Sequence, residues 1–155
     1  MKAYIYKNDK ITVVLLFVVV FIVVYVFGYF NLLEISKDTF NTLITSLSIV
    51  FGFYISSLAI LFNSNFVKNL RVEDELIKKS QLKIHTFIAY FQSSFIWVSI
   101  SLFICLFFSF LHESVYSVLI NFSIIKALIV STLSINLFFA KKIIRFIINA
   151  FLNAK

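Results

Sequence analysis

Four long apolar stretches separated by short polar segments make up most of this chain. They cover about residues 11–33, 40–62, 86–111 and 118–140. Each stretch has the ~20 residues that a helix needs to cross a hydrocarbon layer about 30 Å thick. The pattern predicts an all-α integral membrane protein, a single membrane domain over residues 1–155 with four transmembrane helices. Residues 63–85 are predicted to be a polar connecting loop, and residues 141–155 a C-terminal amphipathic helix.

The composition supports this prediction, because 61% of the 155 residues are hydrophobic and only 14% are charged. A soluble domain of this size leaves a large fraction of its surface in water and cannot hide so much apolar area. With two glycines and no proline, the chain also favours long helices over strands and tight turns.

Lysine and arginine are distributed unevenly among the polar segments, and this predicts the orientation of the chain. Three lie in the first ten residues, five in residues 63–85 and four after residue 140, whereas Lys37 is the one basic residue in the other connections. Because positively charged loops stay in the cytoplasm, we expect both termini and the 63–85 loop to be cytoplasmic. The richness in Ile, Lys, Asn, Phe, Tyr and Ser indicates an AT-rich genome, bacterial or phage, and we expect the protein in the bacterial inner membrane. The net charge of +7 therefore suits the lipid bilayer as a partner, and we expect no binding to nucleic acid.

The second apolar stretch carries small side chains along one helical face for nearly five turns. We call them the small-residue seam: Thr45, Ser48, Gly52, Ser56, Ala59 and Asn63. A weaker stripe in the third stretch, the serine stripe, consists of Ser94, Ser101, Cys105 and Ser109. Small residues let helices approach closely in lipid, where no hydrophobic effect joins them. The seam is expected either to pack on the serine stripe inside a four-helix bundle, or to form the interface or central pathway of a homo-oligomer, with a tetramer favoured.

Lys126 is the one charged residue inside an apolar stretch. It precedes Lys141 by fifteen residues, which is about 22 Å of helix, so we expect it in the outer leaflet. One interpretation is that its ammonium snorkels outward to the headgroups. The other is that it faces a water-filled pathway together with Ser123, Ser131 and Ser134, with Glu113 or a carboxylate of a neighbouring subunit as its ion-pair partner.

Two charged groups lie in the segments predicted to be cytoplasmic. In the 63–85 loop, acidic residues precede basic ones at helical spacing: Glu73, Asp74 and Glu75, then Lys78 and Lys79. They form either a solvated face or the docking surface for a cytoplasmic protein partner. The tail carries a basic stripe of Lys141, Lys142 and Arg145 among apolar residues. This segment is expected to lie on the membrane surface or to pack against its own copies.

Residues for catalysis or cofactor binding do not form a pattern in the sequence. The chain has no phosphate-binding loop, no dinucleotide fingerprint and no pairing of nucleophile and base within the apolar stretches. His85 and His112 lie at opposite ends of the third stretch and cannot share a metal. We therefore expect no enzymatic activity, no metal and no cofactor.

The layout of four spans, both termini inside and one charged inner loop resembles the small four-span subunits encoded in bacterial phage-defence operons, such as the membrane subunit of the Kiwa system. The resemblance covers the whole chain as architecture and transfers no residue. It implies detection of phage injection or membrane disturbance, followed by activation of a cytoplasmic partner. The leading hypothesis is a non-enzymatic, homo-oligomeric membrane sensor. The alternative is a pore-forming or holin-like effector that depolarises the membrane.

Overall fold

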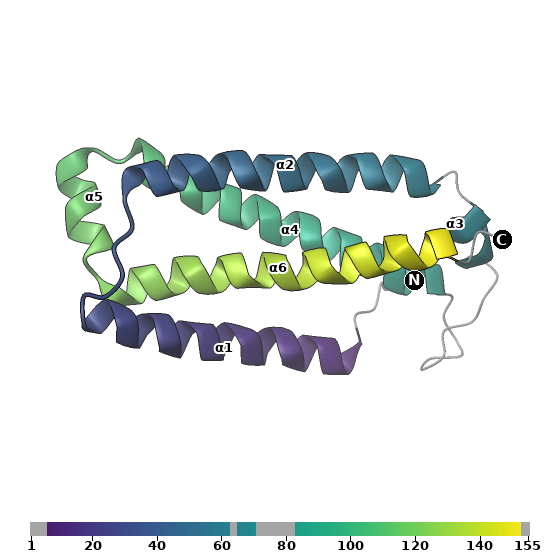
Figure 1. The fold of residues 1–155 in the computed structure, drawn as a ribbon, viewed down its shortest axis with the longest axis horizontal. Helices are drawn as coiled ribbons and strands as arrows, with labels where there is room; N and C mark the ends of the chain where they lie inside the picture. The colour runs from purple at the N-terminus through teal and green to yellow at the C-terminus, as the bar shows by residue number, and fades with distance from the viewer. Residues whose placement is uncertain (1–5, 63–64, 71–82, 153–155) are drawn as a thin grey trace.

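The computed structural model describes residues 6–62, 65–70 and 83–152. In these ranges the chain is helical and contains no strand (Figure 1). The helices are α1 (Lys7–Tyr29), α2 (Lys37–Phe62), α3 (Asn65–Leu70), α4 (Lys83–Phe110), α5 (Glu113–Ile120) and α6 (Ser123–Leu152). Four of them, α1, α2, α4 and α6, are long and apolar enough to cross a membrane. The predicted all-α membrane protein with four spans is confirmed.

The fourth span begins later than the sequence predicted. Residues 118–120 belong to the separate helix α5. Asn121 and Phe122 are not helical, and α6 starts at Ser123. The residues expected to form a separate tail helix instead continue α6 without interruption to Leu152. The 30 residues of α6 extend over about 45 Å, so the helix is longer than the hydrocarbon layer is thick.

Local sequence explains where the first two spans stop and start. Asn31 has a positive φ of 54° and ends α1 in a Schellman motif, in which the amide of Leu32 donates to the Phe27 carbonyl at 2.9 Å. Asparagine tolerates this left-handed conformation better than most residues. Ser36 caps α2, because its Oγ accepts the amide of Thr39 at 3.3 Å. The connector between the two helices is therefore only a few residues long.

The four spans form an open row in the order α1, α6, α4, α2 (Figure 1). Helix α6 packs against α1 on one side and α4 on the other. Helices α1 and α2 stand at the two ends of the row, and each has one principal neighbour. The expected four-helix bundle is thus open, and this leaves α1 and α2 with broad unpartnered faces.

The helix termini lie on two opposite sides of the molecule, and these sides differ in character. On one side, which we call the basic end, α1 begins and α6 terminates (Figure 1). At the other, which we call the α5 end, α5 lies across the helix termini together with the connector between α1 and α2. An aromatic core closes the α5 end: the rings of Phe40 and Phe108 stack with centroids 5.3 Å apart, and Tyr116 of α5 meets Phe40 edge-on.

Candidate functional site

The small-residue seam faces away from the rest of the chain. Its members Thr45, Ser48, Gly52, Ser56 and Ala59 are exposed, and Asn63 lies outside the described residues. A Cβ added at Gly52 would meet nothing within 4 Å in the part of the chain that the structure describes. The expectation that the seam packs on the serine stripe within one chain is therefore wrong.

The face of α2 that does pack carries large side chains. Leu47, Tyr54 and Leu61 of this face are buried, mainly against α4. Because α2 has one principal neighbour, only one of its faces can be covered. The face with the larger apolar side chains makes more dispersion contacts, so the seam is the face that is left exposed.

The serine stripe, in contrast, lies inside the row. Ser94, Ser101 and Cys105 are at most 2% exposed, and Ser109 is half-buried. The hydrogen-bond partners of these serines are not residues of the seam. The Asn136 Nδ2 of α6 donates to Ser101 Oγ at 2.6 Å, and Ser109 Oγ donates to the side-chain Oδ1 of Asn41 at 2.8 Å. The serine stripe thus bonds α4 to α6 at its middle and to the first turns of α2 at the α5 end.

Lys126 occupies the first turn of α6 and is 5% exposed. Its Nζ donates a hydrogen bond to the Leu33 carbonyl at 2.7 Å. Leu33 belongs to the connector between α1 and α2, so Lys126 holds this connector against α6. The predicted ion pair with Glu113 is not formed, and Glu113 pairs with Lys37 instead. A charged donor suits a carbonyl that has no partner within a helix.

The three serines predicted to share a pathway with Lys126 serve packing instead. Ser131 donates to the Ala127 carbonyl at 2.5 Å, and Ser134 to the Ser131 carbonyl at 2.7 Å, both within α6. Ser123 lies against Gly28, where an added Cβ would be 3.1 Å from the Ser123 Cβ. Gly28 is also the buried residue of α1. Close approach of α1 to α6 therefore depends on this glycine–serine pair.

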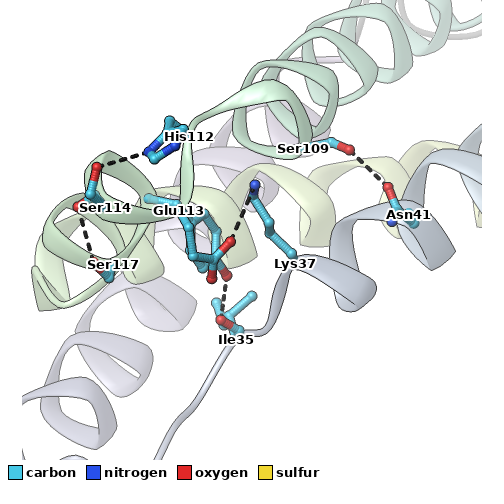
Figure 2. A network of polar contacts seen from close by, with 9 residues as sticks. Ile35, Lys37, Asn41, Ser109, His112, Glu113, Ser114 and Ser117 are labelled. Carbon is cyan, nitrogen blue, oxygen red and sulfur yellow. Dashed lines mark hydrogen bonds and ion pairs between the residues drawn. The ribbon is translucent and has the colours of Figure 1, made fainter.

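Glu113 and its neighbours form a polar network at the α5 end (Figure 2). The Glu113 carboxylate pairs with Lys37 of α2 at 3.4 Å. Tyr116 of α5 donates to the Ile35 carbonyl in the connector. Burial, and then the nearby Glu113 charge, raise the pKa of Tyr116 above its ordinary value of 10.0. The network joins α5 to the start of α2, and the sequence interpretation missed the Lys37 contact.

A second polar cluster lies at the basic end and includes a residue that the sequence interpretation missed, Asp9. Its carboxylate pairs with Lys142 of α6 at 2.8 Å and accepts a hydrogen bond from the Tyr90 hydroxyl of α4. The side chain of Asp9 is 14% exposed and that of Lys142 is 26% exposed. A single acid among the lysines of the N-terminal segment was the available signal. Asp9 joins α1, α4 and α6 at this end.

The remaining predicted residues divide between the exposed surface and the undescribed part. Lys141 and Arg145 are exposed on the last turns of α6. The docking residues Glu73, Asp74, Glu75, Lys78 and Lys79 lie outside the described residues. Within the described ranges, no three metal-ligating side chains come together.

Comparison of the chain with protein-family models, with curated proteins and with solved structures gives no match.

Proposed function

We propose that this protein is a non-enzymatic membrane component that forms homo-oligomers through α2, responds to membrane disturbance and signals to a cytoplasmic protein, as a phage-defence subunit would. In this proposal the basic end faces the bacterial cytoplasm. The observation that carries it is the unpartnered small-residue seam at one end of the helix row.

The contrast between α1 and α2 supports a protein contact at the seam. Both helices stand at an end of the row, but α1 exposes bulky side chains such as Val14, Leu15 and Val18. Such a surface suits lipid chains. Helix α2 also exposes Ile49, Phe53 and Ile55, but between them it exposes Gly52 and hydroxyl residues. The Thr45 hydroxyl already donates to the Asn41 backbone carbonyl within its own helix. A second copy would therefore bind by close packing of backbones at small residues.

The α5 end supplies an element suited to a response. Helix α5 exposes Val115 and Val118 on one side while Tyr116 and Ile120 are buried on the other. An amphipathic helix lying across the end of the spans belongs at the membrane interface, where binding depends on lipid packing. Through the ion pair of Glu113 with Lys37, a displacement of α5 acts on the first turn of α2, the helix that carries the seam.

We call this transmission from α5 through Glu113 and Lys37 to α2 the relay. The hydrogen bonds of polar side chains in the described structure favour the relay over a pore. Lys126 is held by the Leu33 carbonyl, and Ser131 and Ser134 are bonded within α6. A pore lined by Lys126 would require its contact with the Leu33 carbonyl to break. The pore-forming alternative therefore demands a rearrangement that the relay does not.

Substitution at Gly52 tests the oligomer. Gly52→Leu should leave the fold intact, because nothing in the described structure lies within 4 Å of the new Cβ, while it separates the copies. Native mass spectrometry of the purified protein should show an oligomer for the wild type and a monomer for Gly52→Leu. Val18→Leu, on the exposed face of α1, is the matched control and should keep the oligomer. A monomeric wild type, or an oligomer unaffected by Gly52→Leu, would refute the proposed interface.

Expression in bacteria separates the relay from the pore. The relay predicts an unchanged membrane potential, measured with a voltage-sensitive dye, before phage challenge. A pore predicts depolarisation that Lys126→Leu relieves. The relay also predicts that charge reversal at Glu73, Asp74 and Glu75 abolishes protection against phage without changing the oligomer mass. Full protection by that variant would remove the loop from the proposal.

A further inference from the structure

The basic end contains a hollow whose chemistry the proposed function does not use. It has a volume of about 190 Å³, well above the ~10–15 Å³ that a single water requires. Its walls come from the start of α1, from α4 and from the last turns of α6: Tyr6, Asp9, Tyr90, Lys142, Arg145 and Phe146. The hollow lies where three spans meet one membrane surface.

The charges in this hollow leave one cation available for a ligand. Asp9 is satisfied, since it accepts the Tyr90 hydroxyl and pairs with Lys142 at 2.8 Å. Arg145 is exposed and pairs with no carboxylate in the part of the chain that the structure describes. Two cations against one carboxylate give the hollow a net positive charge. A guanidinium that has no carboxylate partner can bind a phosphate through two parallel hydrogen bonds.

An apolar groove continues from the same three helices toward the middle of the membrane. Its volume is about 230 Å³, and its walls are Lys10, Val13, Val14, Ser93, Trp97 and Phe139. Each helix contributes to both spaces at a separation of seven residues: Tyr6 and Val13 before and in α1, Tyr90 and Trp97 in α4, Phe146 and Phe139 in α6. Seven residues are two helical turns, or about 10.5 Å. The groove therefore lies directly below the hollow on one face of the row.

We propose that the hollow and groove together bind one anionic phospholipid of the adjacent leaflet. The phosphodiester contacts the Arg145 guanidinium, while Lys142 stays paired with Asp9, and an acyl chain lies along Val13, Trp97 and Phe139. The aromatic rings of Tyr6, Tyr90 and Phe146 surround the glycerol region, with the Tyr90 and Phe146 centroids 5.7 Å apart. Basic pockets between spans on the cytoplasmic side are suited to anionic headgroups. A lipid has both a phosphate for the hollow and an acyl chain for the groove, whereas a soluble phosphate has no chain to fill the groove.

Titration of the whole purified protein with defined lipids tests this site. Phosphatidylglycerol and phosphatidylcholine of equal chain length are added to the protein in mild detergent, and bound lipid is counted by native mass spectrometry. The wild type should retain one phosphatidylglycerol per chain in preference to phosphatidylcholine. Arg145→Gln should weaken that retention about tenfold or more, the range for a lost charged hydrogen bond.

Matched variants separate this site from general surface attraction. Lys141→Gln removes the same charge from an exposed neighbour that does not line the hollow, and it should weaken retention by about fivefold or less. Ser93→Trp fills the groove without changing any charge and should also release the lipid. Equal effects of Arg145→Gln and Lys141→Gln, or equal binding of the two lipids, would overturn the proposal.

A soluble competitor distinguishes lipid from free phosphate. Glycerol phosphate should displace the lipid only at large excess, because it has no chain for the groove. Displacement at equal concentration would assign the hollow to a soluble phosphate compound and overturn the lipid site. None of these variants touches the small-residue seam, so their outcome is separate from the test of the oligomer through Gly52.

Discussion

The hydrogen bond between Asn136 and Ser101 predicts an unequal response of its two partners to substitution. The Asn136 Nδ2 donates to Ser101 Oγ at 2.6 Å, and the Asn136 Oδ1 has no partner among the described residues. Ser101→Ala therefore leaves the whole amide of Asn136 buried and unpaired, which costs ~1–3 kcal/mol. Asn136→Leu replaces both amide groups by methyl groups on the same branched skeleton, and the Ser101 hydroxyl can then donate to its own helix, as Ser94 does.

The double-mutant cycle should consequently be strongly non-additive. We expect Ser101→Ala to lower the free energy of unfolding by about 1–2 kcal/mol and Asn136→Leu by less than about 0.5 kcal/mol. The double variant should resemble Asn136→Leu. The coupling then equals the Ser101→Ala loss of about 1–2 kcal/mol, above the average of about 0.6 kcal/mol for hydrogen bonds between membrane helices and near their maximum of about 1.7 kcal/mol.

Unfolding in detergent mixed with increasing dodecyl sulfate measures these values, with circular dichroism and the fluorescence of the single tryptophan, Trp97, as probes. Ser99→Ala, at an exposed position of the same helix, is the control and should change nothing. A larger loss for Asn136→Leu than for Ser101→Ala, or additive losses, would refute the reasoning.

Three further predictions concern the close approach of α1 to α6 and the α5 end. Gly28→Leu should lower the free energy of unfolding by ~1–3 kcal/mol in the same assay, because the new Cβ lies 3.1 Å from the Ser123 Cβ; an unchanged value would contradict the packing. Lys126→Met removes the hydrogen bond to the connector, so amide hydrogen exchange at residues 31–36 should accelerate, and unchanged exchange would exclude that role. The raised pKa of Tyr116 means that its neutral form stabilises the fold fully below pH 10 and that this contribution disappears as the pH rises further. Tyr116→Phe should flatten the fall in stability above pH 10 relative to the wild type, and parallel curves would refute the assignment.

The structure changes the interpretation of single residues more than that of segments. The sequence suggests a carboxylate or the lipid headgroups as the partner of Lys126, yet its ammonium binds the backbone carbonyl of Leu33. Every residue carries such a carbonyl, so no sequence pattern identifies the one that a lysine will reach. Asp9 was overlooked because its partners, Tyr90 and Lys142, are 81 and 133 residues away, and nothing local marks them as neighbours.

The sequence by itself determined that four helices cross the membrane, because transfer into lipid depends on the summed hydropathy of each segment and on hydrogen bonds within it. It also determined which faces carry small residues, since helical periodicity is a local property. Only the tertiary structure decided which of those faces is covered. Each face competes with all others for a limited number of neighbours, and in this row the large side chains of α2 occupy the α4 contact while the seam around Gly52 is left exposed.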